Sequence, residues 1–459
     1  MTNAEPGGRR SGWLSLEELR DETAAGRLDT VLVAMTDMQG RLQGKRLDAR
    51  YFLDEVVPNA AEGCNYLLAV DVDMRPVSGY ALASWELGYG DFVLRPDLET
   101  LRRIPWHPNT AMCVADVLTT DGEEVAVSPR QVLRRQLERL GERGYRAYAG
   151  TELEFIVFQE TYEEAWRRAY RDLTPANLYN ADYSLLATAR IEPLLRRIRL
   201  EMAGAGMQVE SAKGECNYGQ YEIAFRYCGA LAKADEHSLF KTGAKEIAAQ
   251  QGCSLTFMAK FNEREGSSCH VHFSLRNEDD EPAFPNGLHG HTDVFEHALA
   301  GMLATVAEMT VLHAPNINSY KRFVAGSFAP TAIAWGRDNR SCAFRVVGEG
   351  AGLRIECRVP GGDVNPYLSI AALVAGAISG IDDKMPLESE FVGNAYESDK
   401  PRIPPTLRQA AHVFAESGFA RSAFGDEVVD HYANAARVEL EAYDSAVTDW
   451  ERFRGFERL

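Results

Sequence analysis

The stretch Gly150-Thr151-Glu152-Leu153-Glu154-Phe155-Ile156-Val157-Phe158 decides how the rest of the chain is interpreted. Its β-branched, aromatic and apolar residues favour a strand, and successive side chains of a strand point to opposite faces. Glu152 and Glu154 therefore share one face, and the apolar residues between them point into a core. Two carboxylates this close repel each other unless a cation lies between them. An isolated pair is more often a solvated strand face, so similar segments are needed elsewhere.

Composition limits the classes of protein that remain. The chain has 459 residues, 45% hydrophobic and 25% charged, which suits a soluble globular protein of two or more domains. The net charge of −18 argues against nucleic acid or an anionic membrane as a partner. Eight cysteines without a C-x-x-C pair disfavour structural zinc and disulfides. We therefore expect a reducing, cytoplasmic location.

Two segments could be mistaken for targeting or membrane elements. The polar N-terminus lacks the apolar core of a signal peptide, and residues 1–13 are predicted to form a flexible tail. The most hydrophobic run, residues 367–381, is shorter than the ~20 residues that a membrane helix needs. It is predicted to be a buried helix.

The remaining chain divides into two expected parts, a small α+β domain over residues 14–118 and a larger domain over residues 119–459. Ser128-Pro129 is a good helix start because Ser caps and Pro suits the first helical position. In the small domain the pattern predicts a helix at 14–25 and strands at 30–38, 41–47, 66–72, 91–94 and 110–117. In the large domain it predicts helices at 163–205, broken near Pro175, and at 232–251, 292–313, 366–381 and beyond 406.

Further segments repeat the polar pattern of the first strand. In residues 268–274 the alternation places His270, His272 and Ser274 on one face. In residues 353–359 it does the same for three charged residues, Arg354, Glu356 and Arg358. Residues 210–222 add three carboxylates, Glu210, Glu215 and Glu222, around a Gly-containing turn. Together these segments predict an antiparallel sheet with one charged face.

Each of these residues alone has an ordinary structural explanation. A lone strand histidine is usually half-buried and satisfied, and arginines beside Glu356 fit an ion-pair ladder as well as substrate binding. Jointly, five or six carboxylates with an imidazole and several arginines do not fit a solvated surface. The oxygen-rich ligand set suits Mg²⁺ or Mn²⁺ better than zinc or copper.

Arginines also gather in residues 318–323 and 335–340 and at Arg345. The guanidinium fork matches carboxylate and phosphate groups, so arginines grouped with hard metals imply an anionic substrate. Phosphoryl transfer is the natural hypothesis, because its transition state spreads negative charge over oxygens that metals and arginines stabilise.

At this point the chain resembles the class I glutamine synthetases and their γ-glutamyl-amine ligase relatives, over roughly residues 14–455. The motifs are Glu152-x-Glu154, Glu215 to Glu222, Gly266-Ser267-x-x-His270-x-His272, Asn318 to Arg322, Asn339-Arg340 with Arg345, and Arg354-x-Glu356-x-Arg358. The resemblance implies an α+β fold, with an N-terminal β-grasp domain followed by a catalytic domain that has a curved antiparallel sheet and flanking helices.

The resemblance also implies a role for each matching residue. Two or three divalent cations, Mg²⁺ or Mn²⁺, are expected, one held by Glu154, Glu215 and Glu222 and one by Glu152, His270 and Glu356. ATP would lie near Glu210, His272, Ser274, Arg345 and Arg354. Arg340 would face the transferred phosphoryl group, and Arg322, Arg358 and Gly266 would hold glutamate. Arg340, Arg322 and Glu154 are the implied catalytic residues.

The family reaction converts glutamate and ATP to γ-glutamyl phosphate, whose activated carbonyl an amine then attacks. This is chemically sensible, because a carboxylate is a poor electrophile until phosphorylation supplies a leaving group. The resemblance implies a homo-oligomer, a dodecamer of two hexameric rings with active sites between subunits.

The chain departs from the family where ammonium would bind. Phe328 stands at the position of the ammonium-binding Glu, and the acidic loop of the first domain has no counterpart in residues 62–68. An aromatic wall in place of a carboxylate favours an amine that carries carbon. Glu265 and Ala351 also differ from the family pattern, and Tyr396 lies in the region of a regulatory tyrosine without matching neighbours.

The identity of the amine stays open between three interpretations. Residues 63–73, Phe328 and the ending 450–457 look most like the actinobacterial branch that γ-glutamylates ethanolamine, which would assimilate or detoxify this amine. A γ-glutamylpolyamine synthetase is the first alternative, and a glutamine synthetase that uses ammonium is the second. A non-enzymatic relative is disfavoured because all six metal-ligand positions are kept.

Overall fold

The computed structural model describes residues 11–459. Residues 1–10 of the predicted tail lie outside the described residues. At Trp13 the chain is already packed, since the guanidinium carbon of Arg102 lies 3.9 Å from the centre of the indole ring. The indole Nε1 also donates to the carbonyl oxygen of Gly206 at 3.3 Å. The start of the described chain thus contacts the segment that follows α7 (Glu192–Gly204).

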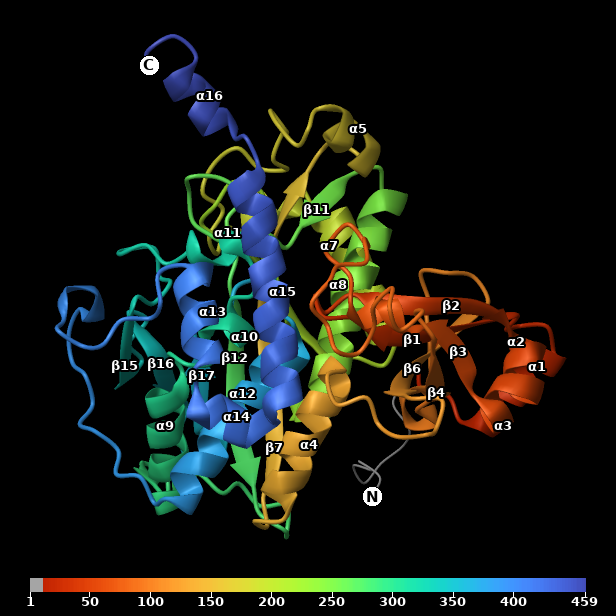
Figure 1. Cartoon of the computed structure of the whole chain (residues 1–459), viewed down its shortest axis with the longest axis horizontal. Coiled ribbons are helices and arrows are strands. Elements are labelled where there is room, and N and C mark those ends of the chain that lie inside the picture. Colours follow the sequence, from red (N-terminus) through yellow and green to blue (C-terminus); the bar gives the residue numbers. More distant parts are fainter. Residues whose placement is uncertain (1–10) are drawn as a thin grey trace.

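A small mixed sheet forms the N-terminal part, shown in red and orange in Figure 1. It follows α1 (Leu16–Ala24), whose N-cap Ser15 forms a capping box with Glu18. The strand order is β2 (Leu42–Asp48), β1 (Thr30–Thr36), β6 (Thr110–Leu118), β4 (Asp91–Pro96) and β3 (Ala61–Cys64), and β5 (Arg102–Arg103) also pairs with β6. β1 and β6 are parallel and the other pairs are antiparallel.

The strand predicted over residues 66–72 is wrong. The chain forms a 3-10 turn at Asn65–Leu68 instead, and β3 just before it pairs with β4. Leu68 and Ala69 are fully buried. The apolar residues of this run indicate that the segment is buried, but they do not indicate a strand. In so short a segment, periodicity cannot distinguish a buried strand from another buried structure.

A large sheet forms the centre of the molecule. Its order is β15 (Ala332–Arg337), β16 (Cys342–Val347), β17 (Arg354–Cys357), β12 (Cys269–Arg276), β7 (Arg146–Phe158), β9 (Gln220–Phe225) and β8 (Val209–Gly214), with β10 (Cys228–Gly229) and β11 (Ser254–Thr256) also paired to β7. All pairs are antiparallel except β15 with β16, which run parallel. A separate pair, β13 (Pro285–Asn286) and β14 (Gly290–His291), lies outside it.

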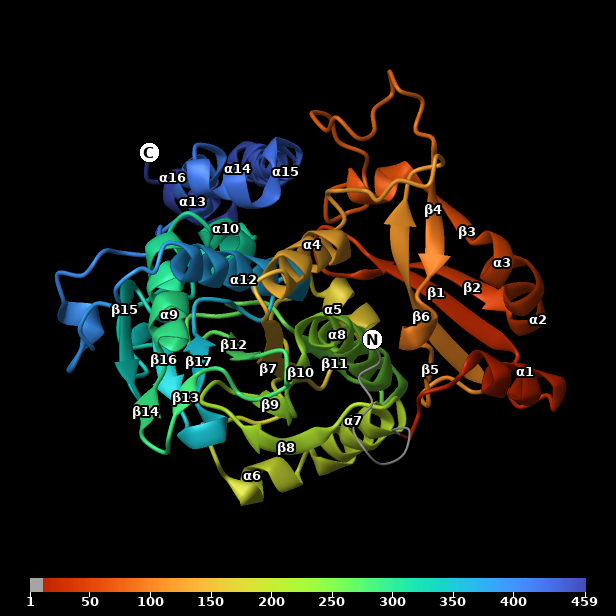
Figure 2. The same ribbon diagram turned by 90° about the horizontal axis from the view of Figure 1, so that it is seen from below.

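Helices cover the apolar face of the large sheet (Figure 2). α4 (Pro129–Gly141) and α8 (Ala230–Gln250) contact β7, and α12 (Pro366–Asp382) lies against α4, α8 and α9 (Asp293–Thr305). The ring of Phe155 on β7 meets that of Phe240 on α8 with centroids 6.3 Å apart. The acidic side chains of β7 must therefore point to the opposite face.

α12 is the apolar run that was predicted to be a buried helix, and it is buried along nearly its whole length. It approaches α9 closely: a Cβ on Gly380 would lie 1.9 Å from the carbonyl oxygen of His297. Only glycine permits this helix contact. None of the helices within residues 11–459 combines the length and apolar character that crossing a bilayer requires.

The helix predicted over residues 163–205 forms as three separate helices, at residues 162–167, 185–189 and 192–204. Left-handed backbone at Ala169, Tyr170, Asp172 and Tyr183 interrupts it, and the intervening residues are loop. The remaining helices are α2 (Ala49–Tyr51), α3 (Val57–Asn59), α5 (Tyr162–Arg167), α6 (Leu185–Ala189), α10 (Thr310–His313), α11 (Ile317–Tyr320), α13 (Leu407–Ala415), α14 (Gly418–Phe424), α15 (Asp426–Ser445) and α16 (Asp449–Gly455). α16 projects from the body near the C-terminus (Figure 1).

A buried arginine joins the small sheet to the large part. Arg130 on α4 is 3% exposed and donates to Asp97 at 2.7 Å, Asp116 at 2.5 Å and Asp235 at 3.0 Å. Two of these aspartates belong to the small-sheet region and the third to α8. A buried charge bound on three sides is costly to separate, so this contact fixes the two parts together.

Candidate active site

Strand register brings the predicted polar residues to one face of the large sheet. Residues directly opposite each other on antiparallel strands share a face. The pairs are His270 with Glu152, Glu222 with Glu154, His272 with Glu356, and Arg345 with Glu356. These four acids, two imidazoles and one arginine come from segments up to about 200 residues apart in the chain. They form a continuous polar band across β16, β17, β12, β7 and β9.

One end of this band is a carboxylate cluster, defined by Glu154, Glu215 and Glu222. One oxygen of each lies within 4.8 Å of the others. Glu154 is oriented by Ser268, whose backbone N–H and hydroxyl donate at 2.9 and 2.5 Å, and by the amide of Gln220 at 3.0 Å. These donors fix the rotamer of Glu154 and leave Glu215 and Glu222 facing it.

The carboxylate cluster is short of positive charge. Burial, with the charge of Glu154, raises the pKa of Glu215 to about 7, and the ion pair with Lys213 opposes this rise. Burial and three neighbouring carboxylates likewise raise the pKa of Glu222 well above its usual value. Three acidic oxygens at this spacing, held in the protein, fit the demand of a hard divalent cation.

The middle of the band contains two imidazoles that converge on one carboxylate. His270 Nδ1 lies 3.2 Å from Glu152 and 3.4 Å from Glu356, and His272 Nε2 lies 2.9 Å from Glu152. Arg354 Nε donates to His272 Nδ1 at 3.1 Å, so the ring proton of neutral His272 sits on Nε2, toward Glu152. Glu152, His272 and Glu356 also lie within 4.8 Å of one another.

An arginine cluster, defined by Arg322, Arg345 and Arg358, also borders the band. Arg345 and Arg358 surround Glu356 at the other end of the band, and Arg322 joins them by donating to the carbonyl of Arg358. Glu356 is fully buried and accepts from Arg345 at 2.8 Å and from Arg358. Burial alone would raise the pKa of Glu356, but His270 and Arg358 hold this pKa below its usual value. Positive side chains thus neutralise Glu356, whereas the carboxylate cluster is short of such positive partners.

The arginine cluster keeps unused donors. Arg322 is buried, its Nη2 donates to the carbonyls of Arg358 and Pro360, and burial lowers its pKa to about 10. The Nε atoms of Arg322, Arg345 and Arg358 are buried and meet no acceptor within residues 11–459. Buried donors without acceptors are costly, and an anionic ligand would relieve that cost.

The other predicted site residues differ in how closely they join this band. A Cβ on Gly266 would lie 2.7 Å from Arg322 Cγ, so Gly266 adjoins the arginine cluster. Ser274 is half-buried on β12, opposite Tyr148. Three predicted residues are exposed: Glu210 at a register irregularity of β8, Arg340 in the turn between β15 and β16, and Phe328. The structure does not bring Glu210 or Arg340 into contact with the band.

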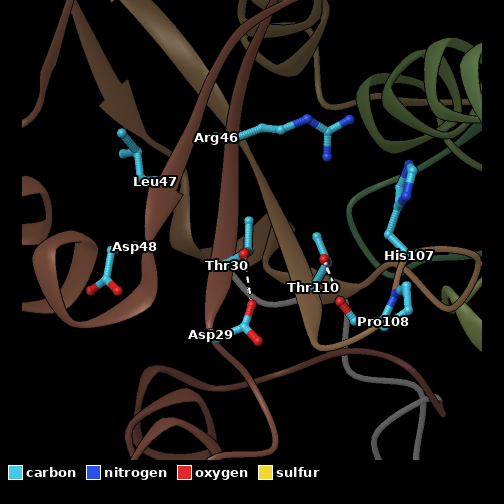
Figure 3. A pocket seen from close by; sticks show the side chains of 8 residues that line it. All are labelled: Asp29, Thr30, Arg46, Leu47, Asp48, His107, Pro108 and Thr110. Atoms are coloured by element: carbon cyan, nitrogen blue, oxygen red, sulfur yellow. Dashed lines mark hydrogen bonds between the residues drawn. The ribbon is translucent and has the colours of Figure 1, made fainter.

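Figure 3 shows a hollow on the small sheet. Its volume is about 520 Å³, and it is lined by Asp29, Thr30, Arg46, Leu47, Asp48, His107, Pro108 and Thr110. None of these is a predicted site residue. This hollow is therefore separate from the predicted site.

Some residues of the site were missed in the sequence. Ser268 and Gln220 stand inside the quoted motifs, so their role as donors to Glu154 could have been found. Asp182 could not, because it reaches Glu215 and Cys216 from a loop that the sequence pattern predicted to be helix. Tyr396, considered as a regulatory residue, has its hydroxyl shielded from solvent.

Comparison with known proteins agrees with this geometry. The family model described as "Glutamine synthetase, catalytic domain" matches residues 126–454. The chain is 61% identical over 456 residues to Gamma-glutamylethanolamide synthetase GlnA4 of Streptomyces coelicolor, covering 99% of this chain and 98% of that protein. It is 36% identical to Glutamate--isopropylamine ligase of a Pseudomonas species, covering 95% of this chain and 97% of that protein.

A solved structure has a similar fold over nearly the whole chain. The "GmaS/ADP complex-Conformation 1" superposes with a TM-score of 0.83 at 25% identity, covering 96% of this chain and 99% of that one. The predicted fold class, a small N-terminal β domain followed by a glutamine synthetase catalytic domain, is confirmed. The motifs, the shared sheet and these matches lead to one conclusion: the chain belongs to the glutamine synthetase family.

Proposed function

We propose that this protein is an ATP-dependent ligase that joins the γ-carboxylate of glutamate to ethanolamine through γ-glutamyl phosphate. One observation carries the proposal: a carboxylate cluster that needs a cation and an arginine cluster that needs an anion share one sheet face. The relative at 61% identity is a Gamma-glutamylethanolamide synthetase, which supports ethanolamine as the amine.

Two groups of residues are proposed to hold divalent cations. Glu154, Glu215 and Glu222 would hold one, and Glu152, His270 and Glu356 would hold the other. One oxygen of each carboxylate in the first group lies within 4.8 Å of the others, and in the second group His270 Nδ1 lies 3.2 Å from Glu152 and 3.4 Å from Glu356. These oxygen-rich donor sets fit Mg²⁺ or Mn²⁺. Bound cations would neutralise charge on phosphate oxygens. His272 also reaches Glu152, and its contact with Arg354 keeps it beside this second group.

The nucleotide is proposed to lie along Glu210, His272, Ser274, Arg345 and Arg354. The related structure with ADP supports a nucleotide in this fold. Arg345 is poised for this role, because it is half-buried and bridges Glu356 and Asp338. Arg340 is exposed in its turn, so it is free to reach the transferred phosphoryl group when substrates bind.

Glutamate is proposed to bind at Arg322, Arg358 and Gly266. The buried guanidinium groups orient its carboxylates, and the bare backbone at Gly266 leaves room beside Arg322. The γ-carboxylate oxygen attacks the terminal phosphorus of ATP, and ADP leaves. The amine nitrogen then attacks the γ-carbonyl carbon, the C–N bond forms, and inorganic phosphate leaves.

Phe328 is proposed to line the amine pocket. Its side chain is 58% exposed and available to pack against the carbons of an amine. No carboxylate replaces the missing ammonium ligand at this position. The closest alternative is a polyamine, and ammonium is the second.

The enzyme is proposed to be cytoplasmic and to assemble as a dodecamer of two hexameric rings. Family membership supports this assembly, in which the small N-terminal sheet of one subunit would close the site of its neighbour.

The test is a phosphate-release assay with purified protein, ATP, glutamate and Mg²⁺, in which ethanolamine, isopropylamine, putrescine and ammonium are compared. Mass spectrometry identifies the amide product. We expect the highest kcat/KM with ethanolamine and a product of the mass of γ-glutamylethanolamide. A higher kcat/KM for ammonium would overturn the proposal and identify a glutamine synthetase.

A further inference from the structure

One loop after β17 holds the side chain of Arg322. In this loop, residues 358–364, the carbonyl oxygens of Arg358 and Pro360 accept from Arg322 Nη2 at 3.1 and 2.7 Å. These acceptors are neutral. An ion pair would neutralise the guanidinium, whereas carbonyl acceptors orient it and leave its charge available for an anionic ligand.

Asp363 of the same loop holds the segment that carries Arg322. Its Oδ2 accepts from the Asn316 amide at 2.9 Å and from the Ser319 hydroxyl at 2.6 Å. Asn316 is the N-cap of α11, and Ser319 lies within this helix. The Ser319 carbonyl oxygen in turn accepts from the Arg322 N–H at 3.2 Å. One carboxylate oxygen is thus bonded to the short helix that leads directly into Arg322.

The loop is a firm support, because hydrogen bonds on both sides of Asp363 fix it to neighbouring elements. Lys241 Nζ on α8 donates to the carbonyl oxygens of Gly362 and Val364 at 3.0 and 3.3 Å. The Gly362 N–H donates to the carbonyl oxygen of Ser267, just before β12, at 2.9 Å. Asp363 therefore has a fixed position from which to hold α11.

The second carboxylate oxygen of Asp363 lies near the guanidinium of Arg322. A Cβ on Gly361 would lie 2.8 Å from Asp363 Oδ1 and 3.5 Å from Arg322 Nε. Both of these atoms are buried, and neither meets a hydrogen-bond partner within residues 11–459. Burial lowers the pKa of Arg322, and the charges of Glu154 and Asp363 oppose this fall. Asp363 thus also supplies negative charge that favours the ionised form of the buried guanidinium.

We propose that Asp363 is a positioning residue for glutamate, which holds α11 through its Oδ2 so that Arg322 meets the substrate carboxylate in a fixed orientation. This inference rests on the proposed function and deepens it, because Arg322 is a proposed glutamate ligand. The loop over residues 358–364 fixes both the backbone and the side chain of Arg322. Glutamate binding should therefore depend on Asp363 more than nucleotide binding does, because the proposed nucleotide residues Arg345 and Arg354 lie on β16 and β17.

The first test compares Asp363→Ala with Asp363→Asn, whose amide oxygen can still accept from Asn316 and Ser319. For Asp363→Ala we expect the KM for glutamate to rise about tenfold, because Arg322 loses its fixed orientation. The KM for ATP and kcat should stay within about threefold. Asp363→Asn should restore the KM for glutamate to within about threefold of the wild-type value, since it keeps the hydrogen bonds to α11.

The matched control is Glu160→Ala, since Glu160 is likewise a carboxylate that accepts from a hydroxyl and an N–H. Its partners are the Thr174 hydroxyl at 3.0 Å and the Thr174 N–H at 2.8 Å. Glu160→Ala should lower the melting temperature without changing the KM for glutamate. If Asp363→Ala raised the KM values for glutamate and ATP equally, its role would be merely structural and the inference would be overturned.

A double-mutant cycle tests the contact through which Asp363 acts. Ser319→Ala removes a hydroxyl that donates to Asp363, and should raise the KM for glutamate about fivefold. Added to Asp363→Ala, it should change this KM by less than about twofold, because both substitutions break the same contact. Effects that multiply would overturn the inference, as would a wild-type KM for glutamate in Asp363→Ala. A wild-type protein that forms no amide would instead overturn the proposed function, and this inference with it.

Discussion

The carboxylate cluster and the arginine cluster are built on the same sheet face with opposite electrostatics. Glu154, Glu215 and Glu222 crowd together, with only Glu215 of the three paired to Lys213, and the pKa values of Glu215 and Glu222 are raised. Glu356 is as deeply buried, yet its pKa is lowered because the charges of His270 and Arg358 favour its ionised form. Burial is common to both ends, so partner charge decides the outcome.

This difference shows which end of the band has its charge neutralised by the protein itself, before any ligand binds. The arginine end neutralises its own carboxylate and keeps further donors for an anion. The carboxylate end reaches a low-energy state only by taking up protons or a cation. Removing one carboxylate should therefore have opposite effects on stability at the two ends, although both changes should impair activity.

The largest effect is expected at the carboxylate end. Glu222→Gln should lower kcat/KM about 10³-fold, because a proposed cation ligand is lost. The same change should raise the melting temperature of the metal-free protein, since it removes a buried like charge. Steady-state kinetics and a thermal melt in chelator measure both, with the exposed Glu55→Gln as control. A lower melting temperature for Glu222→Gln would break the comparison.

At the arginine end the same chemical change should destabilise. Glu356→Gln leaves Arg345 and Arg358 without their buried anion, which costs about 3–5 kcal/mol of unfolding free energy. Denaturant unfolding of the metal-free protein gives this value. If Glu356→Gln proved as stable as wild type, the arginine end would not depend on its carboxylate, and the contrast between the two ends would be lost.

The pH dependence of cation binding tests whether the carboxylate end is protonated in the metal-free protein. Glu215 has a pKa of about 7 in the metal-free protein and must be deprotonated to bind a cation. It is mostly protonated below pH 7, so the apparent affinity for Mg²⁺ should fall about tenfold from pH 8 to pH 6. Calorimetry in buffers of different ionisation enthalpy would detect the released proton. Affinity that is flat over this range would contradict a protonated carboxylate end.

An effect of comparable size is expected in the proposed amine pocket, at the edge of the arginine end. Phe328→Glu restores a carboxylate where the family binds ammonium, and should raise kcat/KM for ammonium about tenfold while lowering that for ethanolamine. Phe328→Leu is the matched control, because it keeps an apolar wall. Equal values for both variants would show that charge at this position does not select the amine.

Much of the site was predictable because strands impose a period of two. Alternation alone placed Glu152 with Glu154, and His270 with His272, on common faces, and the sheet keeps those faces. Alternation gives no register between strands, so the convergence of both imidazoles on Glu152 could not be predicted. Local periodicity also failed in the loop that supplies Asp182 and in the Leu68 segment, where burial and left-handed backbone decided the structure.

The most direct test of the account is anomalous diffraction from crystals grown with Mn²⁺. The account predicts an anomalous peak coordinated by oxygens of Glu154, Glu215 and Glu222 at about 2.2 Å. Mn²⁺ that leaves these three carboxylates unligated and binds only elsewhere on the protein would contradict it.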